Sequence, residues 1–344
     1  MKLLIVTQKI DKNDDVLGFF HGWVAEFAKH CEKVTVITLG AGEYDLPRNV
    51  EVLSLGKEEG KSRLKYTLNF YKYIWSKRKD YDDVFVHMNP EYVVLGGILW
   101  RITGKKIGLW YTHKAKNLKL YIASKLANII FTASSESFGL KSKKLHVLGH
   151  GIDIEKFKPD NKDKVGNIFN IVYVGRISLI KNQQLLTKAV DLLVNQFNFK
   201  DFKVSFVGSP LSKKDEVYKN DIDKFINDKN IGRFINFVGS VPNKDLCEIY
   251  NRADLSINLC PTGGMDKTVL ESVACGLSVI ALNKTFSNIL PVQSILETND
   301  AEELAKKIID LSKSREIQNE LRLEIVRHHS SEKLIQNIIN TYHA

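Results

Sequence analysis

Residues 171–181 read Ile-Val-Tyr-Val-Gly-Arg-Ile-Ser-Leu-Ile-Lys, and this stretch decides the fold class of the chain. Ile171 to Val174 form a short apolar run, which is typical of a buried strand in a parallel sheet. Gly175 lets the backbone turn sharply, and helical periodicity follows from Asn182 to Asn195. A buried strand that turns into a helix is half of a βαβ unit. The stretch therefore predicts an α/β protein with a parallel sheet.

Two cations accompany this turn. Arg176 follows the glycine directly, and Lys181 lies five residues further on, near the start of the predicted helix. The planar donor fork of Arg and the mobile charge of Lys together suit a pyrophosphate. Such a pair is more often a solvated surface feature, so the assignment depends on a second signature.

That signature is residues 263–276, which read Gly-Gly-Met-Asp-Lys-Thr-Val-Leu-Glu-Ser-Val-Ala-Cys-Gly. Gly263 and Gly264 permit a ligand to approach the backbone closely. Residues 266–269 are predicted to form the first turn of a helix, whose amide groups can face an anion. Glu271 lies one turn further in, where its carboxylate could accept hydrogen bonds from ribose. Two strand–helix junctions and two cations predict a diphosphate site.

These motifs resemble those of the family-4 retaining glycosyltransferases, enzymes with the two-domain GT-B fold. The resemblance covers most of the chain and is densest from His150 to Leu282. It implies two Rossmann-like, doubly wound parallel-sheet domains that face an interdomain cleft. In the family, the residues at Arg176 and Lys181 hold the donor diphosphate, and the residue at Glu271 binds the ribose.

The resemblance implies that a sugar moves from a nucleotide diphosphate sugar, of the UDP or GDP type, to a hydroxyl acceptor. The candidate catalytic residues are then Arg176, Lys181, His113 and Asp266. The candidate donor-binding residues are Gly175, Gly239, Val241, Gly263, Gly264, Met265, Lys267, Thr268, Val269 and Glu271. We expect no metal and no other cofactor, because cationic side chains and helix N-termini can stabilise a departing diphosphate. Asp221 and Asp223 have a metal-binding spacing, but they lie in a highly charged helical stretch.

The chain departs from the family pattern at Gly263, where the family has a glutamate eight residues before Glu271. Asp266 could replace that carboxylate, or it could simply be an acidic residue favoured at a helix N-terminus. His113 ends a predicted strand, and both a sugar contact and a structural role are consistent with that position. The departure keeps a second function open, a non-catalytic nucleotide-sugar-binding partner subunit of a glycosyltransferase complex.

The N-terminal half repeats the strand–helix alternation. Strands are predicted at residues 2–7, 33–39, 50–55, 83–88, 106–111 and 129–133, and helices at 16–30, 62–79, 91–103 and 118–126. Further strands are predicted near 170, 204, 235, 255 and 279. We expect an acceptor domain at 1–150 and a donor domain at 151–329; by resemblance, a last helix at about 330–344 packs on the acceptor domain. A nicotinamide-binding domain is disfavoured, because no Gly-x-Gly-x-x-Gly follows the first strand.

Composition bounds the setting of the protein. The sequence has neither a secretory leader nor an apolar run long enough to span a bilayer, and its four cysteines show no metal spacing. We therefore expect a cytoplasmic protein, peripheral at the inner membrane face. The net charge of +10 is partly concentrated in residues 61–79, a basic stretch with interleaved aromatics. It could bind an anionic membrane surface, in line with a glycan or lipid-linked acceptor, or be a core helix with a solvated lysine face. Nucleic acid is disfavoured, because no binding motif for it is present.

Overall fold

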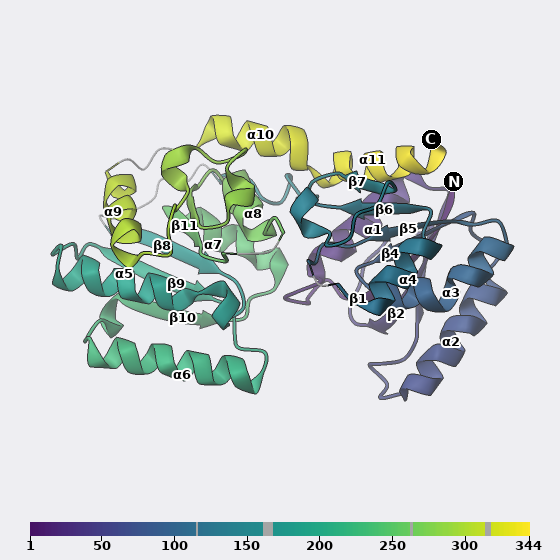
Figure 1. The fold of residues 1–344 in the computed structure, drawn as a ribbon, viewed down its shortest axis with the longest axis horizontal. Coiled ribbons are helices and arrows are strands. Elements are labelled where there is room, and N and C mark those ends of the chain that lie inside the picture. The colour runs from purple at the N-terminus through teal and green to yellow at the C-terminus, as the bar shows by residue number, and fades with distance from the viewer. Residues whose placement is uncertain (115, 161–167, 262–263, 314–317) are drawn as a thin grey trace. The chain divides into compact units, whose positions relative to one another are not determined.

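The structure, a computed structural model, describes residues 1–114, 116–160, 168–261, 264–313 and 318–344. The chain divides into two compact units (Figure 1). Unit 1 comprises Met1–Asp153 together with Ser330–Ala344, and unit 2 comprises Ile154–His329. Among the described residues, no helix combines the length and the apolar character needed to cross a bilayer.

Unit 1 is built on a seven-stranded sheet with the order β3-β2-β1-β4-β5-β6-β7, and every pairing in it is parallel. Its strands are β1 (Lys2–Ile10), β2 (Lys33–Ala41), β3 (Val50–Ser54), β4 (Asp83–His87), β5 (Lys106–Trp110), β6 (Ile129–Thr132) and β7 (Leu145–Val147). The chain order reverses beside β1, since β2 and β3 extend the sheet to one side and β4 to β7 extend it to the other. Ligands of such sheets bind at the carboxyl ends of the strands near this reversal.

Both faces of this sheet are covered by helices, because successive side chains of a strand point to opposite faces. Leu3 and Ile5 belong to the core beneath α1 (Gly18–His30) and α11 (Ser331–His343). Leu4 and Val6 belong to the core beneath α2 (Arg63–Ser76), α3 (Pro90–Ile102) and α4 (Leu118–Leu126). The three helices α2, α3 and α4 therefore form one layer of unit 1, and their outer sides face solvent.

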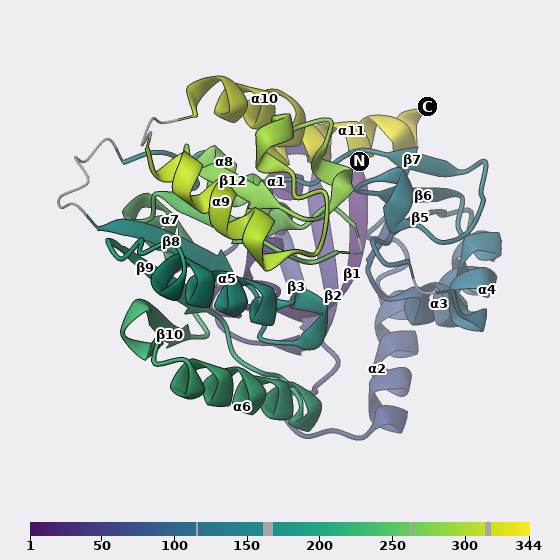
Figure 2. The same ribbon diagram turned by 60° about the vertical axis from the view of Figure 1, so that its left-hand side comes forward.

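Unit 2 is built on a five-stranded parallel sheet with the order β10-β9-β8-β11-β12 (Figure 2). Its strands are β8 (Phe169–Val174), β9 (Phe202–Val207), β10 (Ile235–Gly239), β11 (Leu255–Asn258) and β12 (Ser278–Ala281). One face packs against α5 (Gln183–Asn195), α6 (Lys213–Asp228) and α9 (Ala301–Ser312). On the other side, α7 (Leu246–Arg252) and α8 (Lys267–Ala274) contact the strands, and α10 (Asn319–His329) packs on α8.

The predicted fold class, two doubly wound parallel sheets with helices on both faces, is confirmed by these topologies. Some boundaries were wrong. The first strand runs on to Ile10, because Lys9 and Ile10 continue the pairing with β2 despite their polar neighbourhood. The helix predicted at 62–79 ends at Ser76. Strand β7 was not predicted, since it has only three residues, lies at the sheet edge and exposes two of them.

Candidate donor site

Three glycines end neighbouring strands of unit 2 and bring their backbones together. Gly175, Gly208 and Gly239 follow or end β8, β9 and β10 with φ values of 156°, 140° and 86°. The amide of Gly175 donates to the carbonyl of Val207 at 2.9 Å, and the amide of Gly208 donates to that of Gly239 at 2.8 Å. A Cβ on Gly208 would lie 2.2 Å from the carbonyl oxygen of Gly175. Gly208 was missed in the sequence, although Phe-Val-Gly at 206–208 repeats Phe-Val-Gly at 237–239.

A tyrosine from β8 fixes the backbone that carries Lys181. This lysine ends a short 3₁₀ turn, Leu179–Lys181, directly before α5. The hydroxyl of Tyr173 donates to the carbonyl of Lys181 and accepts a hydrogen bond from the amide of Leu259 at 3.2 Å. Burial raises the pKa of Tyr173 well above its ordinary value of 10.0, so the hydroxyl remains a neutral donor. The turn after β8 is thereby linked to the end of β11.

The side chain of Lys181 forms an ion pair with Asp266, and Asn258 completes the cluster. Asn258 Nδ2 donates to Asp266 Oδ2 at 3.0 Å and to Thr268 Oγ1 at 3.2 Å. Burial acts to lower the pKa of Lys181, but the attraction and hydrogen bond of Asp266 outweigh it and the net shift is upward. Repulsion by the positive charge of Arg176 acts against this rise in the pKa of Lys181, so the two cations lie close enough to interact. Asn258 was not predicted from the sequence, where its only signal is a polar side chain at the end of a strand.

Arg176 itself is exposed, and within the described residues its guanidinium has no ion-pair partner. Helix α8 begins directly after Asp266, so the positive end of its dipole faces the Lys181–Asp266 pair. Gly264 precedes this helix, and its carbonyl accepts from Asn283 Nδ2 at 3.2 Å. Gly263, a predicted donor-binding residue, lies outside the described residues. Met265 and Lys267 are half-buried beside Asp266, whereas Val269 is buried in the first turn of the helix.

Glu271 lies one turn further along α8 and is only 3% exposed. Its Oε1 accepts a hydrogen bond from Asn243 Nδ2 at 3.1 Å, and its Oε2 accepts one from the Tyr250 hydroxyl at 3.5 Å. Asn243 in turn accepts from Lys156 Nζ at 2.8 Å. Each oxygen of this buried carboxylate therefore already accepts a hydrogen bond from the protein.

Glu271 also interacts electrostatically with Lys267, four residues earlier on the same helix. Burial raises the pKa of the Glu271 carboxyl above its usual 4.5, although Lys267 and Asn243 act against that rise. Burial lowers the pKa of Lys267 well below 10.5, with Glu271 opposing it. The charged form of each group is therefore less stable inside the unit than in water. The opposite charge of the partner offsets part of that cost.

Strand β10 ends at Gly239, beside Gly208, and Val241 follows in the next loop. Val241 is half-buried. Phe237, which precedes this loop, stacks on Phe206 with ring centroids 5.2 Å apart and has Lys219 Nζ 3.6 Å from its ring centroid. The Phe237 ring therefore packs within unit 2.

The Asp221–Asp223 spacing lies on α6, away from the strand ends. Lys219 Nζ donates to both carboxylate oxygens of Asp223, at 2.6 Å and 2.7 Å. Across the residues described in the structure, no group of three His, Cys, Asp or Glu side chains has an arrangement that could hold a metal ion.

His113, the fourth candidate catalytic residue, belongs to unit 1. It is exposed and follows β5, and it lines a cavity of about 1010 Å³ at the carboxyl edge of the unit 1 sheet. The same cavity is lined by Lys9 and Asp14, whose side chains form an ion pair at 2.6 Å. The Asp14 carboxylate is thus held by Lys9 within unit 1.

The strand–helix junctions just described all lie in one region of the chain that matches a known protein family. Residues 168–314 match the model of the family described as glycosyl transferases group 1. This region is a group 1 glycosyl transferase domain. It contains both sequence signatures, from the Gly175 turn to helix α8, and the predicted family resemblance is confirmed for it.

Two relatives with assigned names are similar over part of the chain. They are D-inositol 3-phosphate glycosyltransferase 1 of Catenulispora acidiphila and D-inositol 3-phosphate glycosyltransferase of Paenarthrobacter aurescens. Each is 24% identical over 153 residues, which is 42% of this chain and 36% of the relative. The match thus spans little more than a third of the length of these relatives.

Solved structures are similar over the whole chain. Anabaena Alr3699/HepE, solved in complex with UDP and glucose, has a TM-score of 0.79 at 17% identity and is covered completely, as is this chain. Sucrose-phosphate synthase from Thermosynechococcus elongatus has a TM-score of 0.77 at 15% identity, covering 100% of this chain and 98% of that one. The predicted GT-B fold is confirmed by these similarities.

Proposed function

We propose that the chain is a retaining glycosyltransferase that moves a sugar from a nucleotide diphosphate sugar to a hydroxyl acceptor without a metal. The observation that carries this proposal is the convergence of Lys181, Asp266 and Thr268 at the N-terminus of α8, with the exposed Arg176 close to Lys181. Two cations and a helix N-terminus are what a departing diphosphate requires when no metal neutralises it.

In this proposal the ion pair between Lys181 and Asp266 opens when the donor binds. The diphosphate takes the place of the Asp266 carboxylate on Lys181, and Arg176 binds the same group from solvent. Thr268 and the amide groups of the first turn of α8 donate to its oxygens. Glu271 accepts ribose hydroxyls once Asn243 has moved. In the retaining reaction, a phosphate oxygen of the leaving group takes the acceptor proton, so no separate protein base is needed.

The nature of the donor is supported by a structural neighbour. Alr3699/HepE was solved with UDP and glucose, and it covers the complete chain with the same fold. We therefore propose a UDP-sugar as the first donor to test, with a GDP-sugar as the second. In unit 1, the cavity beside His113 is the proposed acceptor site, because it lies at the carboxyl edge of the sheet near the reversal of strand order.

A second candidate function is a nucleotide-sugar-binding partner subunit without catalytic activity. It is favoured by Gly263, which stands where the related motif has a carboxylate. Both candidates predict donor binding, but only the enzyme releases nucleotide diphosphate.

The deciding experiment is a thermal-shift screen with UDP, GDP, ADP and their common sugar conjugates, followed by an assay of nucleotide release. Arg176→Ala and Glu271→Ala should lose the stabilisation, whereas Arg252→Ala, an exposed arginine paired with Glu248 on α7, should keep it. A shift without release or transfer supports the partner subunit. The absence of any shift contradicts both candidates.

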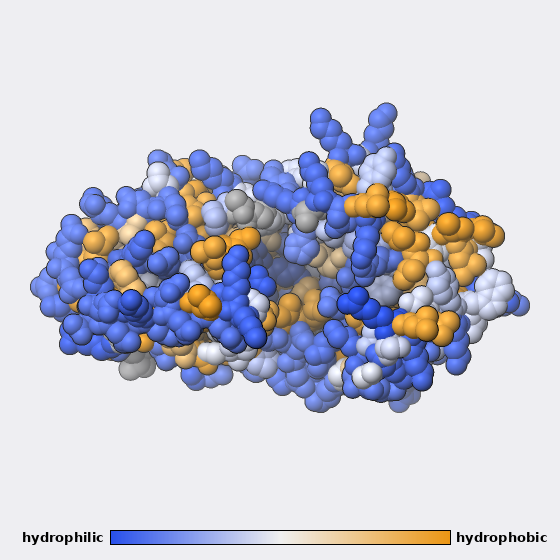
Figure 3. Space-filling model, turned by 60° about the horizontal axis from the view of Figure 1, so that its bottom comes forward, coloured by the Kyte–Doolittle hydropathy of each residue, from blue (hydrophilic) through white to orange (hydrophobic). Residues whose placement is uncertain are grey.

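We also propose that unit 1 contacts an anionic membrane surface through residues 61–79. Leu64, Leu68, Tyr71 and Trp75 are all exposed, and their spacing of four, three and four residues places them in one stripe along α2. The opposite side of the helix is buried through Phe70 and Ile74. The surface view shows hydrophobic side chains among hydrophilic ones over unit 1 (Figure 3).

The charges beside this stripe support the same proposal. Lys65 and Lys72 lie one heptad apart on α2, next to the apolar stripe, and both are exposed. Exposed apolar side chains flanked by lysines are typical of helices that lie in the interface of an anionic membrane. Trp75 reports such contact: it is 53% exposed, whereas the other three tryptophans of the chain are at most 2% exposed. If α2 contacts the membrane, tryptophan fluorescence should shift to the blue when the protein binds vesicles, and Trp75→Phe should lose that shift.

A further inference from the structure

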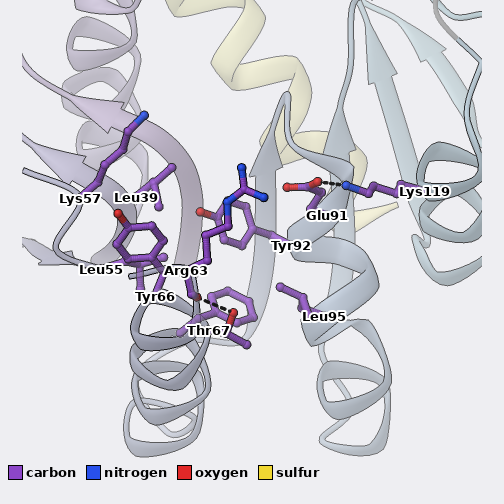
Figure 4. A pocket seen from close by; sticks show the side chains of 11 residues that line it. Leu39, Leu55, Lys57, Arg63, Tyr66, Thr67, Glu91, Tyr92, Leu95 and Lys119 are labelled. Carbon is purple, nitrogen blue, oxygen red and sulfur yellow. Dashed lines mark hydrogen bonds and ion pairs between the residues drawn. The ribbon is translucent and has the colours of Figure 1, made fainter. Parts of the chain in front are cut away.

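A second cavity of unit 1, of about 630 Å³, lies beside the proposed acceptor site (Figure 4). It is formed by the ends of β2 and β3 and by the first turns of α2 and α3. Tyr66 and Thr67 line it from α2, and Tyr92 and Leu95 line it from α3. Four lining residues, Arg63, Tyr66, Thr67 and Phe70, belong to the basic stretch 61–79, whereas the donor-site residues lie in the other unit.

Three cations line the cavity, and two of them have no acidic partner in the part of the chain that the structure describes. Figure 4 shows Arg63 extending into the space between α2 and α3. Within the described residues, neither Arg63 nor Lys57 forms an ion pair, whereas Lys119 is paired with Glu91. The lining thus carries an excess of positive charge. Arg63 is well suited to a phosphate, because its donor fork matches two phosphate oxygens.

The rest of the lining is aromatic and aliphatic. Tyr92 is buried, and burial raises its pKa to about 12, so its hydroxyl is neutral. Phe70 and Leu95 add apolar surface. A site with unpaired cations above an apolar wall fits a ligand that joins a phosphate to a hydrocarbon chain, and it fits a wholly polar ligand less well.

The cavity is continuous with two regions already described. It shares Lys57, Glu91 and Lys119 with the larger cavity beside His113. On its other side, α2 contributes Arg63 and Thr67 to the cavity and the adjacent Leu64 and Leu68 to the exposed stripe. One ligand could therefore place its sugar or hydroxyl in the larger cavity, its phosphate near Arg63 and its chain beside the membrane-facing stripe.

We propose that this cavity binds the phosphate of a lipid-linked acceptor at a membrane surface, with Arg63 as its principal ligand and Lys57 in support. The inference rests on the proposed glycosyltransferase function and names its acceptor class. It also assigns the apolar stripe of α2 a specific task, which is to hold the cavity entrance at the level of lipid headgroups.

The test compares vesicles of phosphatidylcholine that contain either phosphatidylglycerol or cholesteryl hemisuccinate, matched in zeta potential. Phosphatidylglycerol carries its phosphate between a hydroxyl-bearing headgroup and acyl chains, as the proposed acceptor does, whereas cholesteryl hemisuccinate supplies its negative charge through a carboxylate. Binding is followed by the fluorescence of Trp75 and by co-sedimentation. We expect the protein to bind the phosphatidylglycerol vesicles about tenfold more tightly, since a hydrogen-bonded charge pair contributes on that order.

Arg63→Gln and Lys65→Gln form a matched pair of variants, because both remove one exposed charge from the first turn of α2. Arg63→Gln should abolish the preference for phosphatidylglycerol. Lys65→Gln should weaken binding to both vesicles by up to about fivefold and leave the preference unchanged. Arg63→Lys should retain part of the preference, since a point charge replaces the fork.

Three results overturn the inference: no preference in the parent protein, a preference that survives Arg63→Gln, or full competition by soluble glycerol 3-phosphate. The last result would assign the cavity to a free phosphate compound instead of a lipid. Thermal shift with UDP separates this test from the donor proposal, since Arg63 lies in unit 1 and its substitution should leave UDP binding to unit 2 intact. Loss of lipid preference with UDP binding retained locates the defect at the acceptor.

Discussion

Asp266→Asn tests whether the ion pair of the free protein competes with the donor for Lys181. The two side chains are 21% and 20% exposed, so water screens their attraction only in part. Asparagine keeps the shape and the acceptor for Asn258 but removes the negative charge. Losing a charge-assisted hydrogen bond in such a place costs about 2 kcal/mol. In a unit of this size, that corresponds to a fall in Tm of about 5 °C without ligand.

The same substitution should strengthen UDP binding. The diphosphate no longer has to displace a carboxylate from Lys181, and the repulsion between two anions is removed. A gain of about 1.4 kcal/mol corresponds to a tenfold lower Kd, measured by isothermal titration calorimetry. At saturating UDP the variant should therefore recover most of its lost Tm.

The matched control is Asp223→Asn on α6, which breaks the ion pair with Lys219 and lies outside the site. It should leave the Kd for UDP unchanged. Weaker or unaltered UDP binding in Asp266→Asn refutes the displacement of Asp266 by the diphosphate. In that case Asp266 positions Lys181 for the donor, and the ion pair persists in the complex.

Three further outcomes are expected. Replacing Lys267 by Met and Glu271 by Gln together should leave the free energy of unfolding of unit 2 in urea unchanged or raise it by about 1–3 kcal/mol, because two buried charges disappear. Glu271→Gln alone should destabilise unit 2, because Lys267 then loses its partner. Gly208→Ala should cost about 3 kcal/mol in urea unfolding, because its Cβ meets backbone, and Gly239→Ala, with open space at its Cβ, about 1 kcal/mol. Burial acts to raise the pKa of Asp14, but hydrogen bonds lower it below 3.8 on balance. Its contribution to the stability of unit 1 should therefore fall as the pH drops below 3.8. Asp14→Asn should make the plot of unit 1 stability against pH flatter in that acidic range.

The fold could be predicted from the sequence because several of its strands are short, apolar and buried. Ile171 to Val174 is such a run, and it is followed directly by Gly175. What could not be predicted depends on pairing between distant segments. The continuation of β1 to Ile10 is set by its neighbour β2, and β7 exists only because β6 offers an edge.

The candidate site was predictable where one motif carries the chemistry, as in Arg176 and Lys181. It was not predictable where the contacts join distant elements. Tyr173 reaches the amide of Leu259 across 86 positions, and Asn243 reaches Glu271 across 28. Tyrosine and asparagine are common residues without a distinctive spacing here, so only the folded sheet shows that they touch the site.

The return of the chain to unit 1 has a consequence for biosynthesis. Helix α11 buries Leu334, Ile335, Ile338 and Tyr342 in the core that also contains Trp23 of α1 and Trp110 of β5. Those residues leave the ribosome only after the whole of unit 2 has been translated. Until then the nascent first unit exposes an uncovered apolar surface, to which a chaperone can bind. Truncation before α11 should therefore leave unit 1 uncovered and open to quality-control proteases, although the donor motifs remain complete.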